Sequence, residues 1–460
     1  MPTKVSPSWT ARLDALYEFD REPVSSDKLH GFGKFASSFA GEHVAGTEFV
    51  IGPLFVAHGV TASDLFLGLL AGNVLAVLSW AFLCAPIAVK TRLTLYWQLR
   101  RICGPSLTFV YSIVNALMFC FLAGAMIAVA ATAVGLPLGM TMPGLQDMYP
   151  NSALWILVVF LVGAVVTGLA ILGFERFAHF AKICAPWMFL VFVAAAVAVL
   201  PRLGCTTPGD FWQVAKTKIW TGVPLAGQSQ FTFWHVMFFA WFCNMAMHIG
   251  MADLSLFRFA RRWTYGFASS FGMFLGHYLA WISSGILCAA ANVSIAPGPI
   301  AFMGAGLAGA VCVVIAGWTT ANPTLYRAGL ALQAATPNWR RWKVTLAAGA
   351  VTTLAACFPA LVMKLLEFVA LYGLILMPMG AVIFADFWLF PRLGLQPNYA
   401  AARRRLINWP AGLSWILTLI FAFWLPLEIY FKGLPGWFVA LLLYTGLSWL
   451  EQRVRPAEEI

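Results

Sequence analysis

The chain has 460 residues, of which 61% are hydrophobic and only 10% are charged, with a net charge of +11. A soluble domain carries about 25% charged residues, and a chain so poor in charge cannot cover its surface with polar groups, so we expect lipid to surround part of it. The short alternating strands typical of membrane β-barrels are missing from the sequence.

The chain begins with a polar and charged stretch, residues 1–34, which has no apolar core and no cleavage-site pattern. We therefore expect a tail and no removable signal peptide. Apolar segments follow that approach the roughly 20 residues a helix needs to cross a bilayer, separated by loops rich in Pro, Gly and charge. The predicted helices are 35–57, 63–88, 105–135, 152–173, 177–201, 231–254, 263–291, 303–326, 342–361, 364–390, 409–430 and 434–451.

An even number of spans places both termini on one side of the membrane. Of the 29 Lys and Arg residues, 24 fall on that side. This asymmetry predicts cytoplasmic termini in a multi-pass protein of the inner (plasma) membrane. It also accounts for the basic net charge, so we expect no nucleic-acid partner. The opposite side holds five basic residues, Arg202, Lys216, Lys218, Lys364 and Lys432.

The first predicted span is unusual because it contains Glu42, His43 and Glu48 among several glycines. Charged side chains inside a membrane are costly and are usually kept for a function. Glycines at this density permit a break in the helix, which frees backbone groups to bind an ion, a solute or another helix.

The sixth predicted span is interrupted in the same way, with Asn244, His248, Gly250 and Asp253. Two broken helices in corresponding positions of two halves indicate an inverted-repeat transporter with a binding site near the bilayer midplane. The expected fold is therefore an all-α polytopic bundle of about twelve helices. Its predicted parts are a cytoplasmic tail (1–34), a first five-helix repeat (35–201), a second repeat (231–390), two additional helices (409–451) and a cytoplasmic tail (452–460).

The polar residues of the two broken spans each have two interpretations. Glu48 and Glu42 are candidates for contact with the solute, the coupling ion or a proton, or for structural pairing with a neighbouring helix. His43 and His248 can hydrogen-bond between helices or bind the solute. Asp253 precedes several arginines, so structural pairing is expected there.

The eighth predicted span carries adjacent hydroxyls, Thr319 and Thr320, followed by Asn322 and Pro323. Threonine in a membrane helix often hydrogen-bonds to its own backbone. Next to an Asn-Pro break, the two hydroxyls could instead supply oxygen ligands to a hard cation such as Na⁺.

Five motifs in order resemble the nucleobase:cation symporter-1 family, the cytosine, purine, allantoin and hydantoin permeases. The motifs are TASDLFLGLLAGN…AVKTRLTLYWQLRRICGPS (61–106), MADLSLFRFAR (251–261), GWTTANPTLYRAGLAL (317–332), PMGAVIFADFWL (378–389) and INWPAGLSW (407–415). The resemblance covers roughly residues 35–450 and implies a leucine-transporter-like fold, with two five-helix inverted repeats and two C-terminal helices.

The resemblance also implies binding residues. A sodium site would use the backbone carbonyls of Glu42, Ala45 and Ala316 and the hydroxyls of Thr319 and Thr320. The solute pocket would lie among Gly46, Met118, Phe121, Leu122, Cys243, Asn244 and Asn322, and Glu42, Glu48 and His248 complete the candidates from the broken spans.

The chain departs from the family where a Trp and a Gln usually face the nucleobase. Those positions are Met118 and Leu122 here, while Asn244 replaces an aromatic residue of the sixth span. Because buried carboxylates favour a positive partner, we expect a nucleobase-like solute or a donor-rich or cationic heterocycle. Glu48 could alternatively be a proton-coupling group.

The sequence thus predicts a monomeric symporter, not an enzyme, which imports a small solute with Na⁺ or H⁺ by alternating access and uses no other cofactor. Its outer gate would lie near Tyr372. The alternatives are an amine or amino-acid transporter of the same fold and a membrane-embedded metalloenzyme built on the Glu and His residues of the broken spans. Nothing in the spacing of those residues matches a metal motif.

Overall fold

The structure is a computed structural model that describes residues 13, 16, 18–141, 143, 147–291, 297–360 and 365–454. Lys364 and parts of both predicted tails therefore lie outside the described residues. Within the described ranges the chain is helical, and its only β pairings are two isolated bridges, His30 with Ala260 and Thr61 with Thr221.

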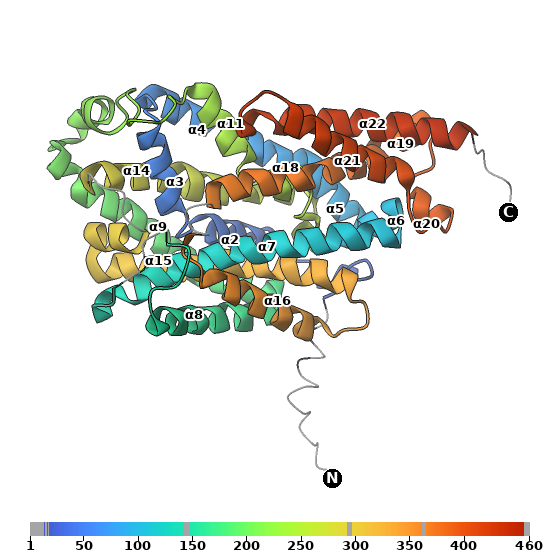
Figure 1. Ribbon diagram of the computed structural model, residues 1–460, viewed down its shortest axis with the longest axis horizontal. Coiled ribbons are helices and arrows are strands. Elements are labelled where there is room, and N and C mark those ends of the chain that lie inside the picture. Colours follow the sequence, from blue (N-terminus) through green and yellow to red (C-terminus); the bar gives the residue numbers. More distant parts are fainter. Residues whose placement is uncertain are drawn as a thin grey trace, which may run out of the picture.

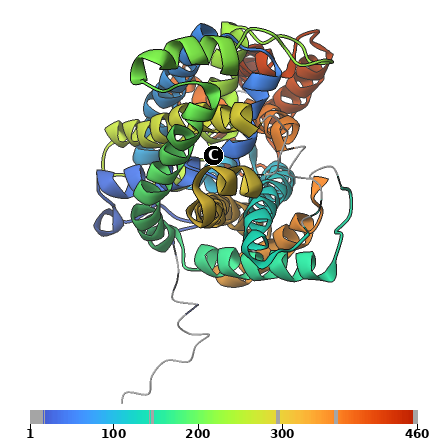
Figure 2. The ribbon, with the colours of Figure 1, turned by 90° about the vertical axis from the view of Figure 1, so that its left-hand side faces the viewer.

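Most helices run along the longest axis of the molecule (Figure 1) and pack side by side around it (Figure 2). The longer ones are α2 (Phe32–His43), α3 (Glu48–Ala57), α4 (Ala62–Ser79), α5 (Ala85–Thr91), α6 (Leu95–Cys103), α7 (Pro105–Val134), α8 (Ala153–Ile171), α9 (Phe174–Val199), α11 (Phe233–Phe242), α14 (Leu279–Ala291), α15 (Pro297–Ala335), α16 (Arg341–Ala356), α18 (Leu365–Phe384), α21 (Trp409–Trp424) and α22 (Gly433–Val454). Shorter helices are α10 (Phe211–Val214), α12 (Met245–His248), α13 (Leu254–Phe257), α19 (Phe390–Leu393) and α20 (Tyr399–Ala402).

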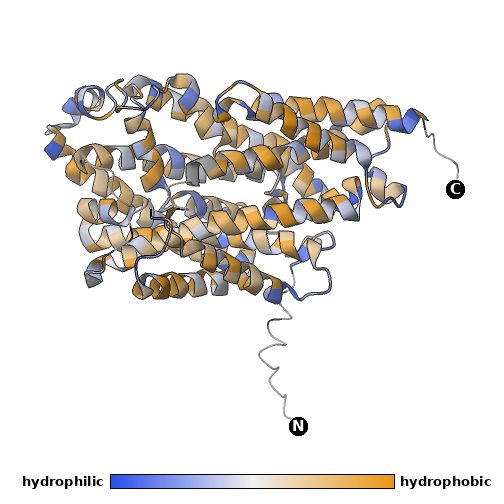
Figure 3. Ribbon diagram, viewed as in Figure 1, coloured by the Kyte–Doolittle hydropathy of each residue, from blue (hydrophilic) through white to orange (hydrophobic). Residues whose placement is uncertain are grey.

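Eight helical stretches among the described residues are long and apolar enough to cross a membrane. They correspond to eight of the twelve predicted spans. Three further spans, at Glu48–Ala57, Phe233–Phe242 and Trp409–Trp424, appear as shorter apolar helices. Hydrophobic residues dominate the long helices, and hydrophilic residues gather near the two ends of the bundle (Figure 3).

Helices α7 and α15 pack against each other along much of their length, and α15 also contacts α9 and α16. The segments that belong to the two broken spans attach to different neighbours. Helix α2 lies against α9, α3 against α14, and α11 against α4. The two breaks are thus enclosed by other helices.

Three helical spans depart from the predicted pattern in ways that matter for the site. The second span contains a π-helical stretch, Trp80–Cys84, and the seventh contains another, Phe271–Tyr278, before α14 begins. Such widened turns are rare and frequently occur at functional sites. Helix α15 extends nine residues beyond the predicted end at 326, to Ala335.

Candidate functional site

The first span is broken as predicted. Helix α2 ends at His43, and α3 begins at Glu48 after a non-helical segment, residues 44–47. Val44 leaves helical geometry, with φ −86° and ψ 67°. The break interrupts the backbone hydrogen-bond ladder inside the bundle, so polar backbone atoms become available to neighbours.

The sixth span is broken too, at two places. Helix α11 ends at Phe242, Cys243 and Asn244 form a turn, and α12 contributes a single helical turn. The chain then turns again over residues 249–253, where Met251 adopts a positive φ of 63°. Non-helical backbone at this depth is tolerated where protein or a cavity surrounds it.

A cavity of about 50 Å³ lies between the two breaks. By volume it holds a few water molecules as it stands, so a larger solute requires the surrounding helices to move apart. It contains carboxylate, imidazole, amide and hydroxyl groups on an otherwise apolar wall. The lining residues are Glu42, His43, Thr47, Glu48, Ile51, Leu122, Met126, Cys243, Asn244, Met247, His277, Thr320, Thr324, Val369 and Tyr372.

Five of the predicted solute-binding residues line this cavity: Glu42, Glu48, Leu122, Cys243 and Asn244. They come from both broken spans and from α7, so these three segments meet at the cavity. Tyr372, the predicted gate residue on α18, lines the cavity as well.

Three other predicted residues have different environments. Phe121 is 38% exposed and contacts the ring of Phe368, so it faces away from the cavity. Met118 is partly buried against the hydrophobic core. At Gly46 an added Cβ would lie 2.9 Å from Val129 and 3.3 Å from the Val313 carbonyl oxygen, so this glycine lets the break of the first span pack closely against α7 and α15.

His248 and Asn322 also lie behind the cavity wall. The His248 Nε2 atom is 3.0 Å from the Trp241 carbonyl oxygen, and its ring packs 4.5 Å from that of Trp80. Asn322 is fully buried on α15. His248 therefore hydrogen-bonds within the protein, which was the favoured interpretation of this residue.

Glu48 is the first residue of α3 and is only 3% exposed. Its carboxylate accepts a hydrogen bond from the Trp281 indole N–H at one oxygen and lies 3.4 Å from the Thr47 hydroxyl at the other. The Ser284 hydroxyl donates to the Glu48 carbonyl oxygen at 2.8 Å. The carboxylate thus receives hydrogen bonds from neutral groups.

Close packing of α3 on α14 brings Glu48 to Trp281. Gly52, one turn after Glu48, leaves no space for a side chain, because an added Cβ would lie 2.6 Å from the Gly285 backbone nitrogen. A larger residue would push the two helices apart. Gly52, one of the glycines of the first predicted span, therefore serves helix packing here.

Two histidines line the cavity beside Glu48. His43 Nδ1 lies 2.9 Å from the Phe39 carbonyl oxygen, and its ring centre is 5.0 Å from that of His277. His277 stacks on Trp281 and its Nε2 is 3.3 Å from Asn244 Nδ2. His277 was not among the predicted site residues, although a histidine within the apolar seventh span was the available signal.

Arg327 forms a buried ion-pair network with both broken spans. Its Nη1 lies 2.5 Å from Glu42 Oε1, and its Nη2 lies 2.5 Å from Asp253 Oδ1. The Trp80 indole donates to the second Asp253 oxygen at 2.7 Å. The predicted structural pairing of Asp253 is confirmed, and the Glu42 carboxylate is engaged in the same network.

Arg327 lies one residue beyond the predicted end of the eighth helix at 326, and that predicted end was wrong. Helix α15 continues to Ala335, and Arg327 is 1% exposed inside it. An arginine at the end of an apolar run gives the same sequence signal whether it enters solvent or meets buried carboxylates. Its two acidic partners come from distant segments, so sequence spacing could not reveal the network.

Four of the five predicted sodium-ligand groups lie close together. Thr320 Oγ1 is 3.0 Å from the Glu42 carbonyl oxygen and 2.8 Å from the Ala316 carbonyl oxygen, and Thr319 Oγ1 is 3.1 Å from the latter. The Ala45 carbonyl accepts a hydrogen bond from the Glu48 N–H at 3.1 Å. Neutral oxygens about 3 Å apart are a donor set that suits a hard monovalent cation.

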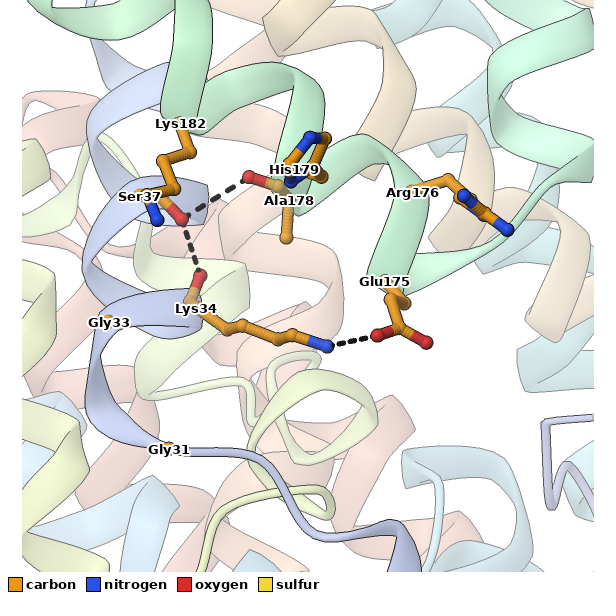
Figure 4. A pocket seen from close by; sticks show the side chains of 9 residues that line it. All are labelled: Gly31, Gly33, Lys34, Ser37, Glu175, Arg176, Ala178, His179 and Lys182. Carbon is orange, nitrogen blue, oxygen red and sulfur yellow. Dashed lines mark hydrogen bonds and ion pairs between the residues drawn. The ribbon is translucent and has the colours of Figure 1, made fainter.

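A larger recess of about 470 Å³ lies between the start of α2 and the start of α9. Figure 4 shows Lys34 reaching Glu175 across it, and Ser37 within hydrogen-bond distance of the Ala178 carbonyl oxygen. This recess does not involve either break, so its size does not make it the candidate transport site.

Comparison with known proteins shows which solved structures share the fold of this chain. No family model matches the sequence, and no curated protein matches it. Among solved structures, the chain is similar to Mhp1, a nucleobase-cation-symport-1 family transporter, in a closed conformation with bromovinylhydantoin bound. The TM-score is 0.74, with 17% identity over 96% of this chain and 98% of Mhp1.

Two further structures agree. The inward-facing conformation of Mhp1 matches with a TM-score of 0.73 and 16% identity over 96% of each chain. A substrate-bound, outward-open Na⁺-coupled sialic acid symporter matches with a TM-score of 0.68 and 12% identity, again over 96% of each chain. The expected fold class, an all-α leucine-transporter-like bundle, is confirmed by these similarities.

Proposed function

We propose that this chain is a cation-coupled secondary transporter that imports a small polar solute, either nucleobase-like or a donor-rich or cationic heterocycle. The observation that carries the proposal is the cavity between two broken helices, lined by polar groups from both. Unwound segments of this kind form solute and ion sites in transporters with inverted repeats.

The transport mechanism proposed is alternating access. A solute enters the cavity when one side of the bundle opens, and leaves when the other side opens. A bound ion drives this cycle only if it binds one of the two states more tightly. Thr320 is well placed for such a role, since its hydroxyl on α15 contacts the Glu42 carbonyl at the break of the first span.

Sodium is the proposed coupling ion, with H⁺ as the alternative. The oxygens of Glu42, Ala316, Thr319 and Thr320 support a sodium site because they converge without a charged side chain between them. Ala45 would complete the set. When bound, Na⁺ would supply a positive charge that stabilises the non-helical segment of the first span, residues 44–47.

The proposed location is the inner (plasma) membrane, with both termini in the cytoplasm and the chain acting as a monomer. The distribution of Lys and Arg in the sequence supports this orientation. The proposed repeats are 35–201 and 231–390, followed by two helices in 409–451, because the breaks at residues 44–47 and 243–244 occupy matching positions in those two parts.

An amine or amino-acid transporter of the same fold is the second candidate, because the cavity-facing Glu48 carboxylate could bind an ammonium group. The metalloenzyme alternative has less support. In the described part of the chain, no group of three or more His, Cys, Asp or Glu side chains could hold a metal ion.

Counterflow in proteoliposomes tests the proposed function. Vesicles containing the protein are preloaded with a nucleobase, a vitamin precursor or a small amine, and uptake of the labelled solute is followed with Na⁺ or with choline outside. We expect Na⁺-dependent exchange of at least one solute class. The absence of exchange for every solute, from protein that melts cooperatively, would contradict a transporter.

A further inference from the structure

The buried charges around the cavity are unbalanced. Three carboxylates, Glu42, Glu48 and Asp253, are each at most 6% exposed. Arg327 is the cation that contacts two of them, through Nη1 and Nη2 to Glu42 and through Nε and Nη2 to Asp253. With the histidines neutral, this network carries a charge of −1, and Glu48 in its ionised form adds a second negative charge.

Glu48 has no cationic partner among the described residues that line the cavity, since none of them is Lys or Arg. Its hydrogen-bond donors, the Trp281 indole and the Thr47 hydroxyl, are neutral. An unpaired charge buried in a membrane protein is costly and usually indicates a site that binds an ion or a solute of opposite charge. A cation at the Thr319–Thr320 oxygens would adjoin Glu42, so it would balance the Arg327 network first.

A second acceptor belongs to His43, which lines the same cavity. His43 Nδ1 lies beside a carbonyl oxygen, which can only accept, so this nitrogen carries the proton and donates. In the neutral ring Nε2 is then an acceptor, and this buried atom has no hydrogen-bond partner in the described structure. Glu48 and His43 together present acceptors to a solute that brings N–H donors.

From this charge balance and acceptor pattern we infer that the solute is a small monovalent cation with N–H donors, of the amidinium or aminoheterocycle class, and that Glu48 is its counter-charge. The inference rests on the proposed function and narrows it. Charge-assisted hydrogen bonds are roughly twice as strong as neutral ones, so the cavity selects the charged member among solutes of one shape.

Amidines and amides of matching shape test this selection. Acetamidine is compared with acetamide, and benzamidine with benzamide, by thermal shift and by calorimetric titration of the full-length protein in saturating Na⁺. We expect the Kd of the better amidine to be at least about 10-fold lower than that of its amide, which corresponds to one charge-assisted hydrogen bond. Equal affinities within a pair, or no binding by either amidine, overturn the inference.

Variants assign the effect to Glu48. In Glu48→Gln the preference for amidine should fall to within about twofold, while Glu22→Gln, at an exposed acidic residue, should keep it. Stabilisation of Glu48→Gln by Na⁺ alone shows that the variant is folded. An unchanged preference in Glu48→Gln overturns the assignment.

The test separates this inference from the proposed function. Na⁺-dependent binding and counterflow of neutral amides alone would preserve the symporter and overturn the cationic solute. Currents on a solid-supported membrane provide a second measurement. More charge should move per cycle with amidine and Na⁺ than with Na⁺ and a neutral solute. Uptake of a proton with the neutral solute, lost in Glu48→Gln, would show that Glu48 binds a proton in place of a cationic solute and would overturn the inference.

Discussion

The Arg327 guanidinium lies 3.0 Å from the Asp253 carboxylate, measured from Nε to Oδ1, and so joins α15 to the segment that follows α12. The same guanidinium binds Glu42 at the end of α2. One side chain therefore connects both broken spans to the helix that packs along α7. Its removal leaves two buried carboxylates without a counter-charge.

Arg327→Gln should destabilise the protein by about 3–5 kcal/mol, the usual cost of breaking a buried ion pair by removing one partner. Thermal melting in detergent measures this effect. Arg262→Gln, at an exposed arginine, is the matched control and should melt like the wild type. The combination of Glu42→Gln, Asp253→Asn and Arg327→Met should regain much of the loss, since it removes all three charges. A stable Arg327→Gln protein would contradict this account of the network.

Thr320→Val should remove the dependence of stability on Na⁺. The substitution keeps the shape of the side chain but deletes the hydroxyl that contacts Glu42 and Ala316. In the wild type, Na⁺ at 100 times its Kd should stabilise the protein by about 2.7 kcal/mol. Melting curves in NaCl and choline chloride test this difference.

The control for Thr320 is Thr353→Val. The Thr353 hydroxyl also hydrogen-bonds within its own helix, to the Gly349 carbonyl oxygen at 2.8 Å, but Thr353 does not line the cavity. It should therefore keep the full response to Na⁺. Equal responses in the two variants would argue against a sodium site at Thr320.

Glu48→Gln should abolish transport and spare folding. Glutamine retains the shape and one oxygen that can accept from Trp281, but it lacks the negative charge. Uptake into proteoliposomes and the melting temperature are measured together, with Glu22→Gln as the control. Unchanged uptake would remove the Glu48 carboxylate from the mechanism.

Gly52→Ala should destabilise the protein by about 1–3 kcal/mol, because the new methyl group would overpack the contact between α3 and α14. Gly168→Ala is the control, since nothing lies within 4 Å of its added Cβ, and alanine should cost nothing or stabilise this helix by up to about 1 kcal/mol. Similar melting temperatures for the two variants would contradict the close approach at Gly52.

The breaks could be predicted from sequence because charged residues and glycines inside an apolar run oppose a continuous membrane helix. Which of two neighbouring residues on a helix lines the cavity could not be predicted from sequence. Leu122 lines the cavity while Phe121 is 38% exposed, although both were expected in the pocket. Successive residues of a helix point about 100° apart, so an error of one residue in the facing side moves a side chain from the site to the outside.

The hydrogen-bond and ion-pair partners of the buried carboxylates could not be predicted from the sequence either. The sequence indicated that Glu42, Glu48 and Asp253 were costly in a membrane, but Trp281, Arg327 and Trp80 come from three other segments. Only the packing of the helices decides which donor meets which carboxylate. Glu42 and Glu48 looked alike in sequence, yet one is paired with arginine and the other is not.

Glu42 is attached to α15 twice. Its carbonyl oxygen meets Thr320, and its carboxylate meets Arg327, seven residues or about two helical turns further along. If the first contact breaks while the second holds, α2 would turn about Arg327 without separating from α15. The ion pair with Arg327 would then be the fixed point of the movement, and the hydrogen bond from Thr320 the contact that breaks.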